Sequence, residues 1–209
     1  MDAPLPTDPH AITSLAALNA LYAEPSEVAR NKVASLLDAP TRAFIAASPF
    51  VLLGTTGPDG PHVTPRGDAP GFVEAADDET LILPDRRGNN RLDALRDIVG
   101  DDRVALLFLV PGAAEALRVH GRATITADPA LRARHVAQGK EPTTVLRVRV
   151  TSLYMQCAKS VIRSRLWAGT PRPAGLPSMG ALMQAHMKGA VKSEEVDARL
   201  TVAYTQTLY

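Results

Sequence analysis

Residues 81–99 read LILPDRRGNNRLDALRDIV, and the fold of the chain is decided in this stretch. The apolar run 81–83 is as short as a buried strand, and Pro84 follows it directly. Apolar residues then recur at helical spacing at Leu92, Leu95, Ile98 and Val99. The stretch therefore predicts a strand, a polar loop and a helix that begins near Asn89.

The loop between that strand and helix carries the side chains that bind anions. It contains Arg86, Arg87, Asn89, Asn90 and Arg91 around one glycine. The first N–H groups of a helix lack internal partners and favour an anion, and arginine adds forked, charge-assisted hydrogen bonds. The loop matches neither a Walker nor a Rossmann fingerprint. It predicts either a phosphate site or a solvated basic turn.

The composition narrows the class of protein. The 209 residues include 23 Lys+Arg and 22 Asp+Glu, a net charge of +1, which gives no case for binding nucleic acid or an anionic membrane. The one cysteine, Cys157, rules out an intramolecular disulfide. The first residues resemble no signal peptide, and no apolar run approaches the ~20 residues of a membrane span. We expect a cytoplasmic protein.

Outside this stretch, short apolar segments alternate with tight turns. Strands are expected at 50–56, 62–65, 72–75, 80–83, 103–110, 117–127 and 144–154, and helices at 11–23, 26–38, 41–47, 89–99, 129–138, 158–167 and 178–188, with a polar tail after them. Tight turns impose antiparallel pairing. The pattern predicts a mainly β protein with flanking helices (α+β), built as a closed or split antiparallel β-barrel.

Four segments, in this order, carry a family resemblance. They are FVLLGTTGPDGPHVTPRGDAPGFV (50–73), LILPDRRGNNRLDAL (81–95), DDRVALLFLVPG (101–112) and LRVHGRATIT (117–126). Together they resemble the FMN-binding split barrel of the pyridoxamine 5'-phosphate oxidase-like superfamily. The PRGD and PDRRGNNR motifs and the CxKxxxRSxLW segment at 157–167 resemble a bacterial subgroup of it.

The resemblance implies three regions along the chain. Residues 1–47 are expected to form a helical arm that packs on the barrel, 48–170 the flavin-binding split barrel, and 171–209 a C-terminal helical extension. All three are expected to make one structural unit.

The resemblance also implies a homodimer with FMN at the subunit interface and assigns residues to it. The strand end near the isoalloxazine and ribityl chain would supply Thr64, Arg66, Gly67 and Asp68. The FMN phosphate would be surrounded by Arg86, Arg87, Asn89, Asn90 and Arg91. The helix beginning near Asn89 would point its N-terminus at that phosphate.

Two sets of residues keep alternative interpretations. Lys159 and Arg163 share a helical face and could reach the partner subunit's FMN, with Trp167 closing the pocket, or they could be a solvated basic face and a packed tryptophan. His62 and His120 lie on expected strands and could relay a proton or be satisfied barrel histidines.

Two departures from the oxidase pattern bear on the substrate. Asn89-Asn90-Arg91 stands where the oxidases carry a Ser-Arg-Lys type triplet, so Arg86 or Arg87 would have to supply the missing cation. The sequence ends in VAYTQTLY and lacks the Trp…Asp-Arg-Leu segment that holds the vitamin phosphate, which argues against pyridoxamine phosphate as substrate.

The leading functional hypothesis is an FMN-dependent oxidoreductase acting on an unknown small molecule. The alternatives are a non-catalytic FMN or deazaflavin binding or sensor protein and, behind it, a haem-binding split barrel. No spacing of His, Cys, Asp or Glu resembles a metal site, and the sequence names no catalytic acid or base.

Overall fold

The computed structural model describes residues 8–207 and 209, and it divides the chain into two compact units, Met1–Val33 and Ala34–Tyr209. The first unit contains the short helices α1 (Leu15–Asn19) and α2 (Glu27–Asn31). Ser14 and Ser26 cap them by accepting a hydrogen bond from the backbone three residues on, as their side chains predict. The helix expected to run to residue 38 ends at Asn31.

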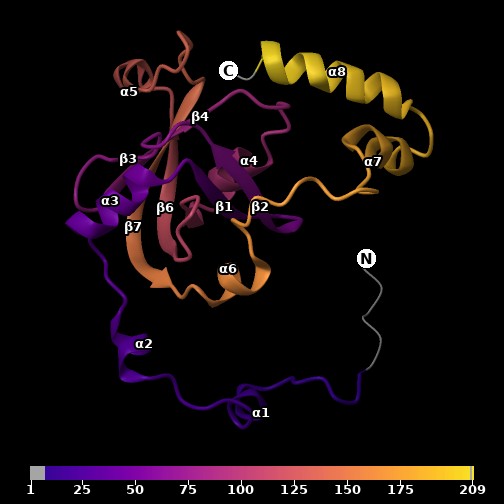
Figure 1. Cartoon of the computed structure of the whole chain (residues 1–209). Helices are drawn as coiled ribbons and strands as arrows, with labels where there is room; N and C mark the ends of the chain where they lie inside the picture. Colours follow the sequence, from indigo (N-terminus) through magenta and orange to yellow (C-terminus); the bar gives the residue numbers. More distant parts are fainter. Residues whose placement is uncertain (1–7, 208) are drawn as a thin grey trace. The chain divides into compact units, whose positions relative to one another are not determined.

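The second unit is organised by one antiparallel sheet of seven strands (Figure 1). Its strands are β1 (Phe50–Gly57), β2 (Gly60–Gly67), β3 (Glu74–Ala75), β4 (Thr80–Asp85), β5 (Arg103–Leu109), β6 (Ala116–Thr126) and β7 (Thr144–Gln156). The order across the sheet is β2-β1-β5-β6-β7-β4-β3. This confirms the predicted class, an antiparallel sheet with flanking helices.

Alternation along the strands builds the core on one face of the sheet. Val51 and Leu53 of β1 are fully buried, as are Leu106 and Phe108 opposite them on β5. The turn between β1 and β2, which contains Pro58 and Asp59, has Gly60 at φ +114°, a conformation that favours glycine.

Side chains, rather than a hydrogen-bonded ladder, bring the two ends of the sheet together. β2 is one edge strand, and β4 lies next to the other edge. The sheet curls far enough for Arg66 of β2 to pair with Asp85 at the end of β4. This is a split barrel, and the gap between β2 and β4 is where its polar residues meet.

The segment before the sheet belongs to the same unit. Ala34 makes an isolated antiparallel bridge with Leu153 of β7, and α3 (Ala39–Ala47) follows, capped by Asp38. Leu37 and Ile45 are buried in the core. The expected arm of residues 1–47 is therefore divided, because burial of these side chains joins α3 to the sheet. The packing of the rest of the arm on the barrel stays a prediction.

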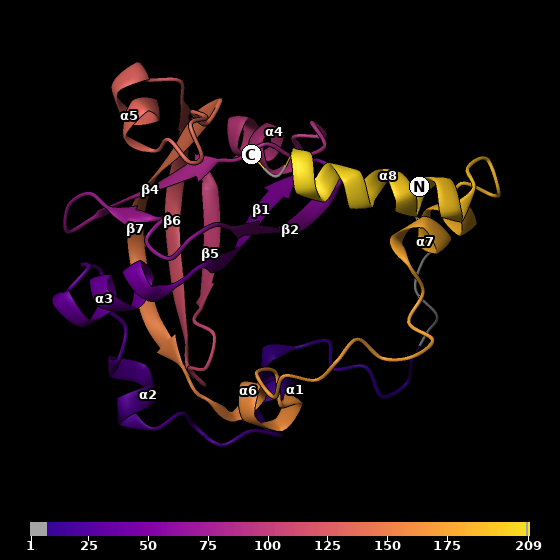
Figure 2. The ribbon, with the colours of Figure 1, turned by 45° about the horizontal axis from the view of Figure 1, so that its top comes forward.

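Five more helices in the described part of the chain lie between the strands or follow the last strand. They are α4 (Asp93–Gly100), α5 (Pro129–Arg134), α6 (Lys159–Ser164), α7 (Met179–His186) and α8 (Ser193–Gln206). The two views agree that α4 lies beside β1 and β2 and that α7 and α8 pack together (Figure 2). The expected polar tail contains α8, which buries Val196. Within the described residues, no helix is long and apolar enough to cross a membrane.

Candidate functional site

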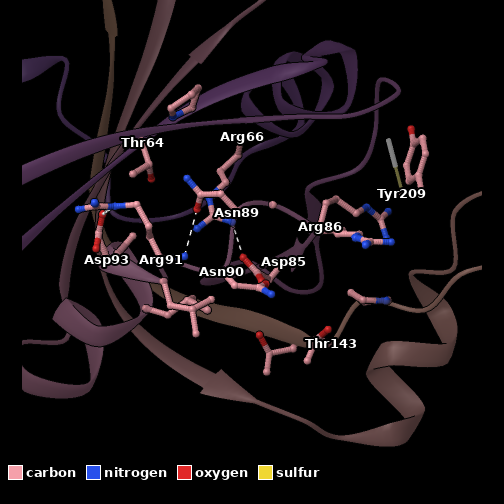
Figure 3. A pocket seen from close by; sticks show the side chains of 18 of the residues that line it. Thr64, Arg66, Asp85, Arg86, Asn89, Asn90, Arg91, Asp93, Thr143 and Tyr209 are labelled. Carbon is pink, nitrogen blue, oxygen red and sulfur yellow. Dashed lines mark hydrogen bonds and ion pairs between the residues drawn. The ribbon is translucent and has the colours of Figure 1, made fainter. Parts of the chain in front are cut away.

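A cavity of about 860 Å³ opens between the end of β2, the loop after β4, the start of α4 and the segment before β7 (Figure 3). Seven residues predicted from the sequence line it: Thr64, Arg66, Arg86, Arg87, Asn89, Asn90 and Arg91. Such a volume suits a cofactor-sized ligand. The fold thus brings the two predicted groups, which lie about twenty residues apart in sequence, to one cavity.

Arg66 enters the cavity from β2 and is paired across the gap. Because β-strand side chains alternate, Thr64 and Arg66 share the face of β2 that is turned toward the cavity. One guanidinium nitrogen of Arg66 donates to Asp85 Oδ1. Its Nε is buried and has no hydrogen-bond partner among the described residues. Arg66 therefore keeps a donor for a further group.

Arg86 is held in an ion pair that is largely, but not fully, buried. Its Nε donates to Asp68 Oδ2 at 2.6 Å, and another guanidinium nitrogen donates to the backbone oxygen of His135 at 2.6 Å. The side chains of Arg86 and Asp68 are 18% and 4% exposed. Arg86 thus supports the cavity wall through these two contacts. Which of Arg86 and Arg87 supplies the extra cation stays a prediction.

Asp68 is the centre of this cluster. Arg86 and the Tyr209 hydroxyl occupy its carboxylate, the latter donating at 2.6 Å. Asp68 does not line the cavity, and its assignment to the flavin stays a prediction. Burial raises the pKa of Asp68, but the hydrogen bonds from Tyr209, the Ala69 N–H and Arg86 outweigh burial and lower it overall. The same contact raises the pKa of Tyr209.

The loop after β4 is longer than its sequence predicts, because the helix begins later than Asn89. Asn90 and Leu92 lie in the left-handed region, at φ 59° and 60°, and α4 begins only at Asp93. Asn89 Oδ1 accepts the backbone N–H of Arg91 at 3.1 Å. The expected helix start near Asn89 is therefore wrong, because this Asx turn and the two left-handed residues take the place of the first helical turn.

The cations of this loop differ in how free they are. Arg91 pairs with Asp93 at 2.9 Å, and both side chains are well exposed. Arg87 is exposed and, within the part of the chain that the structure describes, makes no hydrogen bond or ion pair. Arg87 is consequently the guanidinium of the loop that remains available to an anion, with Arg91 beside it in a weak surface pair.

Five predicted residues lie outside the cavity lining. Gly67 ends β2, and Asp68 forms the ion pair with Arg86. Lys159 and Arg163 belong to α6, and Trp167 to the segment after it. The Trp167 indole N–H donates to the backbone oxygen of Ala113 at 2.7 Å. Within one chain, therefore, Lys159, Arg163 and Trp167 lie outside the cavity that the other predicted residues line.

Sequence reasoning missed the far wall of the cavity. Residues 140–143, just before β7, line it, and so do Thr144, the first residue of β7, and Tyr209. The Thr144 Oγ1 atom is buried without a partner among the described residues. No local pattern indicates these residues, although Asp85, which stands inside the quoted motif, could have been found as the carboxylate beside three arginines. The described residues contain no cluster that could hold a metal ion.

Comparison with known proteins agrees with this architecture. The model of the family described as pyridoxamine 5'-phosphate oxidase matches residues 37–157, more than half of the chain. The match runs from just before α3 through the end of β7 and includes the β2 and β4-loop walls of the cavity. No curated protein sequence matches the chain.

Solved structures are similar at low sequence identity. HupZ from Group A Streptococcus is 16% identical, with 56% of this chain and 90% of that chain covered and a TM-score of 0.46. A putative pyridoxamine 5'-phosphate oxidase from Lactobacillus delbrueckii is 20% identical, with 58% and 95% covered and a TM-score of 0.47. General stress protein 26 from Bacillus anthracis is 18% identical, with 54% and 88% covered and a TM-score of 0.42.

Proposed function

The chain belongs to the pyridoxamine 5'-phosphate oxidase family, and on that premise we propose that its cavity binds FMN and that the protein is an FMN-dependent oxidoreductase acting on a small molecule. The observation that carries the proposal is Arg87, an exposed guanidinium without a described partner that lines a cavity of about 860 Å³. A phosphate would supply the counter-charge that the loop lacks.

The residues of the cavity suit such a ligand along its whole length. Arg87 and Arg91, with the amides of Asn89 and Asn90, offer donors to the phosphate. Arg66 Nε and Thr144 Oγ1 are buried polar atoms that lack partners among the described residues, and a polar ligand could satisfy them. Thr64 and the Arg66–Asp85 pair would hold the part of the cofactor that is remote from its phosphate.

FMN, when bound, supplies the electron-transfer chemistry. The residues of this chain would anchor its phosphate, place positive charge from Arg66 nearby and limit access of water. Neither the sequence nor the residues that line the cavity identify a proton donor or acceptor for the reaction. A non-catalytic FMN or deazaflavin protein therefore remains the alternative that the experiments below must separate from the enzyme.

A homodimer forms part of the proposal, because the sheet leaves an apolar face exposed next to the cavity. Phe50 and Leu52 of β1, Val63 and Pro65 of β2 and Leu107 of β5 alternate with the core residues and share that outer face. Val63 is 67% exposed. Pro65 also lines the cavity, so a partner covering this face would border the ligand. In such a dimer, Lys159 and Arg163 would reach the FMN in the partner subunit's cavity, and Trp167 would close that cavity.

The cofactor is tested by the colour of the protein. We would purify the chain from a flavin-replete host, record the visible spectrum, and identify any released chromophore by mass, which separates FMN from a phosphorylated deazaflavin. Stoichiometric FMN supports the proposal. A colourless protein that fails to bind added FMN refutes it. Reduction by NADH or NADPH with turnover of an acceptor separates the oxidoreductase from the sensor.

The phosphate assignment is tested by a matched pair of variants. Loss of a charge-assisted hydrogen bond costs about 1.5–3 kcal/mol, so Arg87→Ala should raise the Kd for FMN about 10- to 100-fold. Arg96→Ala removes an exposed arginine of α4 that does not line the cavity and should leave the Kd unchanged. Equal affinities of both variants would contradict the phosphate assignment.

The dimer is tested by light scattering after size-exclusion chromatography. Val63→Asp places a charge on the exposed face, on the edge strand β2. The control, Val99→Asp, changes a valine of α4 that is also well exposed but lies elsewhere. The first variant should be monomeric and the second dimeric. A monomeric parent protein would refute this part of the proposal.

A further inference from the structure

His62 of β2 is joined to α4 through a buried carboxylate. Its Nδ1 lies 2.6 Å from Asp97 Oδ2, and the Thr55 hydroxyl of β1 donates to the same oxygen at 2.7 Å. The Asp97 side chain is 4% exposed, whereas that of His62 is 37% exposed. A carboxylate held away from water depends on such donors, so His62 and Thr55 together fix where Asp97 lies.

The packing around Asp97 leaves α4 little freedom. A β-carbon on Gly57, at the end of β1, would lie 2.0 Å from Asp97 Oδ1. Only glycine permits this approach, which brings the helix directly onto the β1–β2 hairpin. The position of α4 on the sheet is therefore set at Asp97, one turn after the helix begins.

The first turn of the same short helix forms a wall of the cavity. Asp93, Ala94 and Leu95 of its first turn line the cavity, together with the loop that precedes them. That loop contains the left-handed residues Asn90 and Leu92. Any shift of α4 on the hairpin would move this first turn and the loop with it.

We propose that His62 is a positioning residue for the cavity: through Asp97 it holds α4 on the β1–β2 hairpin and thereby fixes the loop of residues 86–92 in the geometry that binds an anion. His62 does not line the cavity. The identity of the ligand rests on the proposed function, whereas the coupling of His62 to the loop does not.

The charge of His62 makes this coupling depend on pH. The groups that face it are Asp97 and Asp93 on α4, Asp59 in the hairpin turn and the neutral Thr55 on β1. The hydrogen bond and charge of Asp97 raise the pKa of His62. Protonated His62 holds Asp97 by an ion pair, and neutral His62 by a hydrogen bond alone. Anion affinity should therefore be highest at low pH and fall as pH rises through this raised pKa.

The experiment uses three variants of the full chain and FMN as the probe. His62→Ala removes the donor, and His62→Asn keeps an uncharged donor near the position of Nδ1. His120→Asn is the control, because His120 is a half-buried strand histidine on β6, stacked on Tyr154 and outside the cavity. The Kd for FMN is measured from about pH 5.5 to about pH 8.5, the range in which histidine titrates.

The parent protein and His120→Asn should lose FMN affinity as pH rises. His62→Ala should bind about tenfold more weakly at the low end, the equivalent of one charge-assisted hydrogen bond, and should show a flat pH profile. His62→Asn should recover part of the affinity and also be flat. If the His62 variants lower only Tm and keep the parent's pH profile of affinity, the role is merely structural and the proposal is overturned.

A second measurement keeps the inference separate from the cofactor. Hydrogen exchange of residues 86–100 in the ligand-free protein, corrected for intrinsic rates, should show protection that falls with pH in the parent and is low at every pH in His62→Ala. Equal protection in both proteins overturns the coupling. If the parent binds no FMN, the proposed function fails, and the exchange data still decide whether His62 positions the loop.

Discussion

Replacing Arg86 by methionine tests whether the cavity wall depends on its buried ion pair. Methionine has a similar length but donates no hydrogen bond. The change removes the 2.6 Å bond to Asp68 Oδ2 and the 2.6 Å bond to the His135 carbonyl. It leaves the Asp68 carboxylate, 4% exposed, with the Tyr209 hydroxyl and the Ala69 N–H as its remaining donors.

Breaking a buried pair by removing one partner costs about 3–5 kcal/mol, and the two remaining donors favour the lower end of this range. For a chain of this length 1 kcal/mol shifts Tm by about 2–4 °C, so Arg86→Met should lower Tm by about 6–12 °C. The assays are urea unfolding, which gives the free energy, and thermal unfolding, which gives Tm, both on the ligand-free protein near neutral pH and followed by far-ultraviolet circular dichroism.

The dependence on pH adds a second test of the same pair. The pKa of Asp68 is lowered in the folded protein, so its contribution to stability is present above the unfolded pKa and is lost as pH falls through the folded value. In Arg86→Met this acid-dependent loss should shrink. The double variant Arg86→Met/Asp68→Asn should regain much of the stability, because the uncompensated charge is gone.

Arg91→Met is the matched control, because it breaks an exposed pair with Asp93 and should change the free energy of unfolding by less than about 1 kcal/mol. An effect of Arg86→Met as small as that of the control would refute the reasoning. So would strict additivity of the Arg86 and Asp68 changes.

Three further perturbations follow from the described contacts. Gly121→Ala places a β-carbon 2.5 Å from a backbone oxygen of β7 and should destabilise by at least about 1–3 kcal/mol in urea unfolding, whereas Gly100→Ala, with open space around it, should not. Phe108→Ala empties a fully buried position and should cost about 3–5 kcal/mol in the same assay; a smaller loss would mean that the core collapses around it. The carboxyl of Asp101, with its pKa lowered to about 2 by the Arg103 guanidinium, should titrate by NMR near that value, and Arg103→Ala should move the midpoint toward 3.8. The stability from this pair should be lost only as pH falls through the lowered pKa; an unmoved midpoint would contradict the assignment.

The sequence alone determined the strands and the class of fold, because these depend on local pattern. The continuous apolar run at 104–110 and the glycines at positions 57 and 60 act over a few residues, and the structure places β5 and the β1–β2 hairpin there. The sequence also predicts the end of β4 and the basic loop that follows it. The start of α4 was not, because two left-handed residues displaced it to Asp93.

Only the tertiary structure decided which cation of the loop is free. Arg86 and Arg87 are neighbours of the same type, and no local pattern separates them. Arg86 meets Asp68, eighteen residues earlier, and the carbonyl of His135, forty-nine residues later. Arg87 meets no described partner. Pairing of charges is set by distance in space and by burial, so the curl of the sheet, rather than the order of residues, placed one arginine in the wall and left the other without a described partner.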